Sequence, residues 1–390
     1  MRFLHTSDWH LGRTPAGRSR SDEFAAVLDA VVRIARDERA DCLLLSGDVY
    51  EHRTSSPEAD HFLFDTLVRL HRAGIPVVAI PGNHESPERW RALAPLFVEI
   101  GVRVVSEVRP PGSGGTVEVP SRDGNELAVV ACLPFVAERH FSSAAALFAG
   151  ADRWHRDYAR GMGNLIAAMA GLFRPDRVNI LMAHLHTEGA LLGGGEAEIT
   201  IDETCAVAPA RLPTLASYVA VGHIHRPQVL PRSPVPARYA GSLLQLDFGE
   251  RDQEKSVVIV DAAPGGVATT RTLALGAGRP LHDVAGTLDE LRAAAASLGD
   301  AWLRLTVRSD GPIPAVADRV REILPRAVRV VPDHPLRATA PDQAAVVLTK
   351  LQPREQYAAY HQKMHGTPPS AELLATFAEV HEAVLLAEDV

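Results

Sequence analysis

The stretch Arg2-Phe3-Leu4-His5-Thr6-Ser7-Asp8-Trp9-His10 decides how the rest of this sequence is interpreted. It is an apolar run of strand length that ends on a carboxylate and an imidazole two residues apart. If the backbone stays extended, both side chains point to the same side. A carboxylate oxygen and an imidazole nitrogen suit a borderline divalent metal ion. The Asp-x-His pair alone is a weak signal, because a polar turn after a strand has the same composition, so later segments must support it.

Later apolar runs repeat this pattern of a buried strand followed by Asp, Asn or His. These runs lie at 41–48, 76–80, 178–183 and 218–221. Apolar residues at helical spacing predict helices over 21–39 and 57–73, between the first three strands. Alternating strands and helices are typical of layered α/β folds, in which sites form beyond the carboxyl ends of the strands. We expect one sheet to bring the following polar residues together: Asp8, His10, Asp48, Asn83, His84, His184, His223 and His225.

The chemistry of this set favours two transition-metal ions. Carboxylates, an amide oxygen and several imidazoles suit Mn, Fe or Zn better than Ca or Mg, which prefer shells of oxygen alone. Asp48, on a middle strand, is the candidate bridge, because a shared carboxylate reduces the repulsion between two cations. Two ions about 3.5–4 Å apart activate a water and stabilise both ends of an in-line phosphoryl displacement. His84, next to Asn83, is then left as a general acid or hydrogen-bond donor to the leaving oxygen.

The rest of the chain predicts further strands, a small second domain and a helical tail. A strand over 102–105, a hairpin of 117–119 with 127–133, a helical region over 141–173, and strands over 237–246 and 256–260 complete the first part. For the basic segment Arg153–Arg160, we favour a solvated helix face over a nucleic-acid contact. A helix and a strand then occur twice, at 288–298, 302–307, 313–324 and 327–331, and two helices close the chain at 353–364 and 370–386. The expected domains are 1–275, 276–345 and 346–390.

Composition limits the classes of protein that fit. The 390 residues carry a formal net charge of -8, which counts mildly against indiscriminate nucleic-acid binding. No stretch is long and apolar enough to span a membrane, and no secretory signal is visible. We expect Cys42 and Cys132 to be buried free thiols, which fits a reducing cytoplasm. The arginines of the first loop, Arg13, Arg18 and Arg20, contact either solvent or a substrate phosphate, and the sequence does not decide between the two.

The polar segments resemble the five motifs of the calcineurin-like metallophosphoesterases. The motifs are Asp8-x-His10, Gly47-Asp48, Gly82-Asn83-His84-Glu85, His184 and Gly222-His223-Ile224-His225. Within this family, four features resemble the SbcD group of bacterial nuclease subunits in particular. They are the stretch His5–Gly12, the segments Gly47–Tyr50 and Gly222–Gln228, and the run Arg238-Tyr239-Ala240-Gly241-Ser242. The resemblance covers residues 1–262, and beyond these only the layout of a capping domain and a helical tail is similar.

The resemblance implies a layered β-sandwich flanked by helices, with two divalent ions, Mn²⁺ in the SbcD group. It places one ion among Asp8, His10, Asp48 and His225, the other among Asp48, Asn83, His184 and His223, with His84 as the catalytic residue. It implies a cytoplasmic 3′–5′ DNA exonuclease and endonuclease that acts in DNA repair, recombination and replication. The implied partners are DNA and an SbcC-type ATPase with a coiled coil, in a heterotetramer with a homodimeric nuclease core and no membrane.

Two positions near the motifs need separate interpretation. Some relatives carry a second catalytic His three residues after the bridging Asp, and this sequence has Glu51 there. His52, one residue later, either replaces that His or is a plain loop residue, and of the two we favour the loop residue. We also interpret His186 as a non-ligand, because the family's ligand directly follows the strand, as His184 does.

Two rival functions stay open. A phosphatase or cyclic-nucleotide phosphodiesterase would keep all the ligands but has no need of residues 276–390. A non-catalytic scaffold would have lost ligands, and here every motif position is filled.

The tail has two possible placements. It either folds back onto its own domain or docks on the ATPase through an apolar stripe. That stripe consists of Leu373, Leu374, Phe377, Val380, Val384 and Leu385, preceded by Tyr357, Tyr360 and Met364.

Overall fold

The computed structural model describes residues 1–137, 141, 158–194, 206–334, 353–365 and 368–378. The chain divides into two compact units, Met1–Thr306 with Ala317–Val331, and Val307–Val316 with Pro332–Val390. None of the described helices is long and apolar enough to cross a membrane. The helices and strands that matter for the site belong to the first unit.

The first sheet has six strands in the order β12-β11-β1-β2-β3-β4. Its four parallel strands are β1 (Arg2–Thr6), β2 (Cys42–Ser46), β3 (Val77–Ile80) and β4 (Val102–Val104). Two antiparallel pairings extend the sheet on the β1 side, through β11 (Ser256–Asp261) and β12 (Thr269–Ala274). Parallel neighbours need crossover helices. Here these are α1 (Ser21–Asp37), α2 (Pro57–Arg72) and α3 (Pro87–Glu99).

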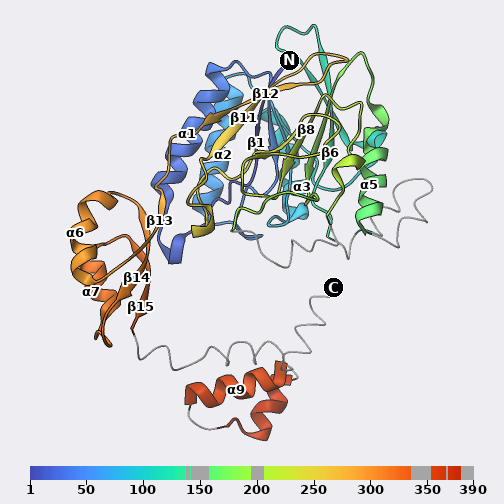
Figure 1. Cartoon of the computed structure of the whole chain (residues 1–390). Coiled ribbons are helices and arrows are strands. Elements are labelled where there is room, and N and C mark those ends of the chain that lie inside the picture. Colours follow the sequence, from blue (N-terminus) through green and yellow to red (C-terminus); the bar gives the residue numbers. More distant parts are fainter. Residues whose placement is uncertain (138–140, 142–157, 195–205, 335–352, 366–367, 379–390) are drawn as a thin grey trace. The chain divides into compact units, whose positions relative to one another are not determined.

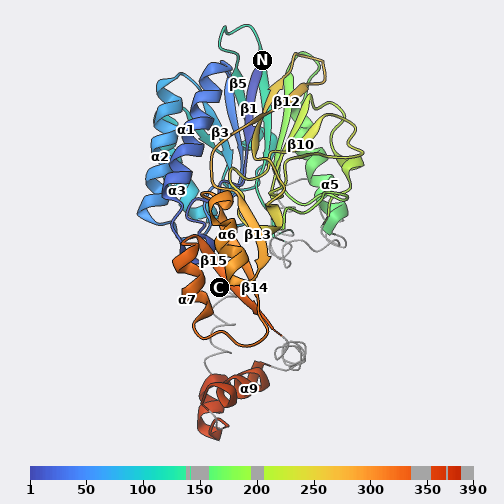
Figure 2. The same ribbon diagram turned by 60° about the vertical axis from the view of Figure 1, so that its left-hand side comes forward.

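The second sheet also has six strands, in the order β5-β6-β7-β8-β10-β9. The strands are β5 (Thr116–Pro120), β6 (Leu127–Leu133), β7 (Val178–His184), β8 (Tyr218–Gly222), β9 (Gln228–Val229) and β10 (Ala237–Tyr239). The expected hairpin of β5 and β6 is present, and β6, β7, β8 and β10 run parallel. Helix α5 (Tyr158–Met169) packs on this sheet, on the side of the sandwich away from α1 and α2 (Figure 1; Figure 2).

Three apolar layers hold the two sheets and their helices together. The middle layer lies between the sheets and contains Phe3, Leu44, Ile180 and Val258. Alternate residues of the same strands face outward, so that Leu43, for example, packs under the helices instead. Each of these strands is therefore covered on both faces, which explains why its residues form a continuous apolar run in the sequence. The structure thus confirms the layered sandwich flanked by helices.

A three-stranded sheet follows, in the order β13-β14-β15, with two helices. Its elements are β13 (Leu281–Gly286), α6 (Leu288–Leu298), β14 (Trp302–Arg308), α7 (Val316–Ile323) and β15 (Ala327–Asp333). Helix α6 begins with a reciprocal capping box of Thr287 and Glu290. The tail contains α9 (Pro353–His365) and a helix over 371–378, and the ring of Tyr357 stacks on that of Phe377 at 4.3 Å. Short 3-10 turns lie at Pro15–Gly17, Pro111–Ser113, Ala170–Leu172, Pro209–Arg211 and Phe248–Glu250.

The structure corrects several predicted elements. The strand expected over 237–246 ends at Tyr239, because Ser242 caps the following turn through its side chain, which donates to the carbonyl of Leu244. Helix α3 was not predicted, although Ser86 caps it and Pro87 opens it, because Pro95 interrupts its pattern. Strands β12 and β13 were also missed. Residues 142–157 of the helical region expected over 141–173, which include part of the basic segment, lie outside the described residues, as do Cys205 and the expected boundary at 345–346.

Candidate metal centre

Both sheets contribute to the site, so the expectation of a single sheet was wrong. Asp8, Asp48 and Asn83 follow β1, β2 and β3 of the first sheet, whereas His184 ends β7 and His223 follows β8 of the second. The carboxyl ends of these parallel strands meet at one edge of the sandwich. Among the described residues, potential ligand atoms lie within 4.8 Å of one another in three groups: Asp8, His10 and His225; His10, Asp48 and His84; and Asp48, His184 and His223.

The backbone around these residues is strained. Asp8, His10, Asp48 and His223 have φ values of 51°, 47°, 51° and 101°, in a region that side-chain-bearing residues seldom adopt. The expectation that Asp8 and His10 share an extended backbone was therefore wrong. The chain turns immediately after β1, and the amides of Asp8 and His10 donate to the carbonyls of Gly47 and Asp48. Such strain is kept where the surroundings impose it, as at functional sites.

Two glycines of the motifs are needed because the loops approach each other closely. A Cβ on Gly82 would lie 2.1 Å from Oδ1 of Asp48. A Cβ on Gly222 would lie 2.0 Å from the carbonyl oxygen of Ser46, on the opposite sheet. No side chain fits at either distance, so Gly at these places lets candidate ligands from neighbouring loops converge.

One potential ion position, called here the Asn83 position, consists of Asp48, Asn83, His184 and His223. Nε2 of His184 lies 3.3 Å from Oδ2 of Asp48 and 3.1 Å from Oδ1 of Asn83. Oδ1 of Asn83 lies 3.0 Å from Nδ1 of His223. Burial lowers the pKa of His184, but the Asp48 carboxylate outweighs burial and raises this pKa to about 9. The position thus stabilises positive charge, which a bound cation would supply.

The other potential position, called here the Asp8 position, consists of Asp8, His10, His225 and the shared Asp48. The rings of His10 and His225 are 4.7 Å apart. Nε2 of His10 is buried without a hydrogen-bond partner, 3.7 Å from Oδ2 of Asp48. Burial and the neighbouring Asp48 raise the pKa of Asp8. An orphaned imidazole nitrogen beside two buried carboxylates is an arrangement that fits a divalent cation.

His84 lies at the edge of this cluster and is partly exposed. Its amide donates to Oδ1 of Asp48 at 3.0 Å, and its ring lies 4.7 Å from the ring of His10. Its Nδ1 is 2.7 Å from the carbonyl oxygen of Glu51, so that Nδ1 carries the hydrogen. The remaining nitrogen, Nε2, is then the one available to a substrate.

This constellation matches a known family. A family model described as "Calcineurin-like phosphoesterase" matches residues 1–227. The chain belongs to this family. A second model, described as "Type 5 capsule protein repressor C-terminal domain", matches residues 277–365, which include the three-stranded sheet and α9.

Curated relatives resemble the chain over most of its length. The SbcD subunit of the nuclease SbcCD from Bacillus subtilis (strain 168) is 31% identical, and the alignment covers 98% of both chains. The protein of the same name from Rhodobacter capsulatus is 31% identical over 92% of this chain and 94% of the relative. That of Escherichia coli (strain K12) is 27% identical over 85% of this chain and 84% of the relative. The resemblance recognised in the sequence is confirmed.

Within this phosphoesterase, two glutamates support the histidines of the Asp8 position. Nδ1 of His10 donates to Oε2 of Glu51 at 2.9 Å, and Nδ1 of His225 donates to Oε1 of Glu250 at 3.0 Å. Burial would raise the pKa of Glu51, but the hydrogen bonds from His10 and Arg13 lower it to about 2. Burial likewise opposes ionisation of Glu250, but Lys255 and His225 hold its pKa well below the usual range. Glu250 was not predicted from the sequence, because no motif spacing connects it to His225.

Glu85, the last residue of the Gly82-Asn83-His84-Glu85 motif, connects two loops of the site. Its buried carboxylate accepts the amides of Gly82, Tyr50 and Asp48, at 2.6, 2.8 and 3.1 Å. It therefore joins the loop after β2 to the loop after β3. Burial and the Asp48 charge raise the pKa of Glu85 to about 8.

The remaining candidates lie around the centre. The guanidinium of Arg13 donates to Glu51 at 2.6 Å and is about a third exposed. Arg18 is exposed. Arg20 is buried in an ion pair with Glu23, so Arg20 stabilises the fold and does not face a substrate. His52 is exposed, and His186 belongs to none of the potential metal-binding groups of the described residues. Cys42 and Cys132 are buried free thiols, as expected.

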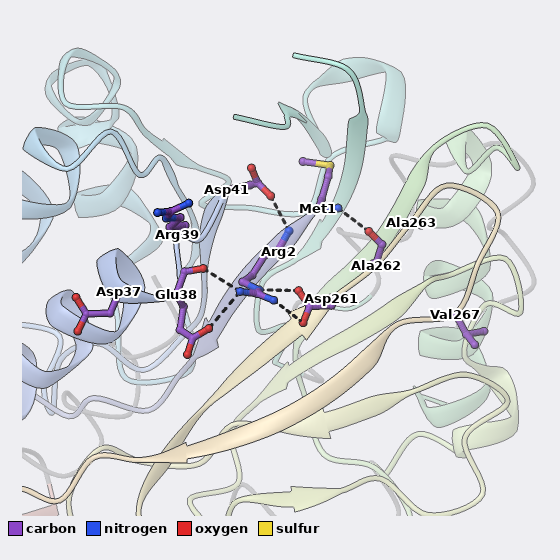
Figure 3. A pocket seen from close by; sticks show the side chains of 10 residues that line it. All are labelled: Met1, Arg2, Asp37, Glu38, Arg39, Asp41, Asp261, Ala262, Ala263 and Val267. Carbon is purple, nitrogen blue, oxygen red and sulfur yellow. Dashed lines mark hydrogen bonds and ion pairs between the residues drawn. The ribbon is translucent and has the colours of Figure 1, made fainter. Parts of the chain in front are cut away.

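A hollow of about 840 Å³ lies at the other end of β1 (Figure 3). Its polar groups bind one another. The guanidinium of Arg2 contacts Asp261 at 2.7 Å and Glu38 at 3.3 Å, and the backbone amide of Arg2 donates to Asp41. We assign no function to this hollow, because its central charge, that of Arg2, is already paired with Asp261 and Glu38.

Proposed function

We propose that this chain is the nuclease subunit of an SbcCD-type complex and hydrolyses DNA phosphodiester bonds with two Mn²⁺ ions. The observation that carries the proposal is the position of Asp48, whose Oδ2 lies 3.7 Å from Nε2 of His10 and 3.3 Å from Nε2 of His184. A shared carboxylate between two sets of imidazoles is what a pair of ions requires. We propose 3′–5′ exonuclease and endonuclease activity on DNA in the cytoplasm.

Each side chain has a defined part in this proposal. When bound, two divalent cations would activate water and stabilise the charge of the phosphoryl group. Asp48 contributes to both positions, and the left-handed backbone at Asp8 and His10 directs their side chains inward. His84 keeps one proton on Nδ1, which donates to the carbonyl oxygen of Glu51, and gives a second proton from Nε2 to the leaving oxygen. Arg18, exposed in the loop before α1, contacts a DNA phosphate, and Arg13 joins it on the substrate side of Glu51.

The purified chain tests this function directly. With Mn²⁺, we expect it to shorten linear duplex DNA from the 3′ end and open a DNA hairpin, without hydrolysing a small phosphomonoester. Metal analysis should give two ions per chain, and Asp48→Asn should lose both ions and DNA cleavage. Asp37→Asn, at an exposed carboxylate that lines the hollow at the other end of β1, is the control. Faster hydrolysis of the phosphomonoester than of DNA would favour a phosphatase instead.

We propose that residues 346–390 dock on an SbcC-type ATPase, beyond a nuclease domain over 1–275 and a capping domain over 276–345. The stacked rings of Tyr357 and Phe377 join α9 to the helix over 371–378 as a hairpin. Tyr360 and Leu373 nevertheless stay exposed, at 57% and 37%. Exposed apolar side chains on a helical hairpin suit a helix of a partner. The assembly is a heterotetramer with two nuclease subunits at its centre.

Deletion of residues 346–390 tests the docking. We expect the truncated chain to keep its ions and its cleavage of a small phosphodiester, and to lose co-purification with the ATPase. Tyr360→Ala with Leu373→Ala should reproduce the loss in the full-length chain, while Glu372→Ala, at an exposed neighbour, should not. Full-stoichiometry co-purification of the truncated chain would show that the tail is not the docking element.

A further inference from the structure

His10 and His225 of the Asp8 position have a different kind of supporting partner from His184 of the Asn83 position. At the Asp8 position, Nδ1 of His10 donates to Glu51 and Nδ1 of His225 donates to Glu250. Both glutamates are buried, with Glu51 6% exposed and Glu250 fully buried. At the Asn83 position, Nδ1 of His184 lies 2.8 Å from a neutral group, the backbone carbonyl of Ser46.

Each of these glutamates is itself held by a cation. Arg13 donates to Oε1 of Glu51 at 2.6 Å, while Oε2 faces His10. Nζ of Lys255 lies 2.7 Å from Oε2 of Glu250, which also accepts the amide of Leu246 at 3.1 Å. The two oxygens of each carboxylate are thus divided between a fixed cation and one imidazole. Both carboxylates therefore stay ionised and fixed in place although they are buried.

A carboxylate that accepts from Nδ1 has two effects on an imidazole. It fixes the tautomer, so that Nε2 carries the free lone pair, and it makes that lone pair a stronger donor. Nε2 of His10 is buried and has no hydrogen-bond partner, as this account requires. The Asp8 position also includes the carboxylate of Asp8, where the Asn83 position has a neutral amide.

We propose that Glu51 and Glu250 are positioning residues that make the Asp8 position the tighter of the two, so that it fills first. This inference rests on the proposed two-ion function and adds an order of loading to it. It also gives Glu51 a role where some relatives carry a second catalytic His. Here the residue acts on the metal through His10 and does not act on the substrate.

Titration of the metal-free full chain with Mn²⁺ tests the proposal without an activity assay. Calorimetry should resolve a tight and a weaker binding step. Electron paramagnetic resonance should show an isolated ion at one equivalent and a coupled pair at two. Glu51→Gln and Glu250→Gln each keep an oxygen that accepts from Nδ1 but remove its charge. We expect each to weaken the tight step by about 10–100-fold and to leave the weaker step within about twofold.

Two further variants make the assignment specific. Asn83→Ala should weaken the second step alone, and Glu254→Gln, an exposed glutamate four residues from Glu250, should change neither. Thermal unfolding of the metal-free variants checks that each one is folded. If Glu51→Gln and Glu250→Gln weaken both steps equally, or neither, the inference is wrong while the two-ion function stands. If the wild-type chain binds fewer than two ions, the proposed function fails and the inference fails with it.

Discussion

Nδ1 of His84 lies 2.7 Å from the backbone carbonyl oxygen of Glu51, the residue whose side chain accepts from Nδ1 of His10. One residue therefore orients the candidate catalytic imidazole through its backbone and a candidate ligand through its carboxylate. A backbone carbonyl cannot be removed by substitution, so the orientation of His84 does not depend on which side chain occupies position 51. The two functions of this residue can be separated by experiment.

Replacement of His84 by Gln should leave both ions bound and reduce turnover. The loss of a proton donor to the leaving oxygen typically costs about 10²–10⁴-fold in rate. Saturating Mn²⁺ should not restore the rate, because the defect does not lie in metal affinity. The measurements are the kcat for DNA cleavage and the metal content of the same preparation. His52→Gln, at an exposed residue of the adjoining loop, is the matched control and should keep full activity. DNA cleavage near the wild-type rate in His84→Gln would contradict the assigned role.

A methyl group at Gly82 should disrupt the site without removing any candidate ligand. The added Cβ would lie 2.1 Å from Oδ1 and 2.6 Å from the amide nitrogen of Asp48. The amide of Gly82 also donates to Glu85, so the loop cannot retreat without breaking that hydrogen bond. We expect Gly82→Ala to lose both ions and to lower the free energy of unfolding by about 1–3 kcal/mol, as overpacking does.

Gly112 offers the control for this experiment, because an added Cβ there meets no atom within 4 Å and its backbone is not left-handed. Gly112→Ala should retain two ions and wild-type stability, as judged by metal analysis and urea unfolding. Retention of two ions by Gly82→Ala would mean that the loops after β2 and β3 are more adaptable than their contacts indicate.

The sequence predicted most of this site because the strands are buried on both faces. Continuous apolar runs marked the strands, and Asp48, Asn83 and His184 followed them directly. The distribution of the candidate ligands over two sheets was not predictable. Strand order depends on pairings between residues far apart in sequence, such as Phe3 with Val260. The left-handed backbone at Asp8 was missed for a related reason. It arises from a hydrogen bond to Gly47 of another loop, which no local pattern encodes.

The supporting residues were harder to predict than the candidate ligands. Glu250 reaches His225 only because residues 240–250 turn back after β10, where the sequence pattern had suggested a continuing strand. Ser242 stabilises that turn by donating to the carbonyl of Leu244. Glu51 was noticed as a departure from the family's pattern, but its direction toward His10 is a consequence of the tertiary fold.

A buried histidine outside the site should govern part of the acid sensitivity of the fold. His5 lies between the sheets, with its Nδ1 2.9 Å from the hydroxyl of Tyr218. Burial and the positive charge of Arg238 lower the pKa of His5 to about 3. In the unfolded chain the pKa is about 6.5, so below that pH the unfolded state binds a proton that the folded state does not. The free energy of unfolding should therefore fall as the pH decreases from 6.5 toward 3.

His5→Phe should remove this contribution, because phenylalanine does not titrate. As the pH falls from 6.5 to 5, the free energy of unfolding of His5→Phe should decrease by about 2 kcal/mol less than that of the wild type. At pH 7.5 the variant should lose about 1 kcal/mol with the hydrogen bond to Tyr218. Tyr218→Phe removes the same hydrogen bond but leaves His5 titratable, so it should keep the pH dependence of the wild type. Urea unfolding of the metal-free chains at both pH values measures the difference, since other titrating groups are common to all three proteins. Equal pH dependence in the wild type and His5→Phe would show that His5 is protonated in the folded state or is accessible to water.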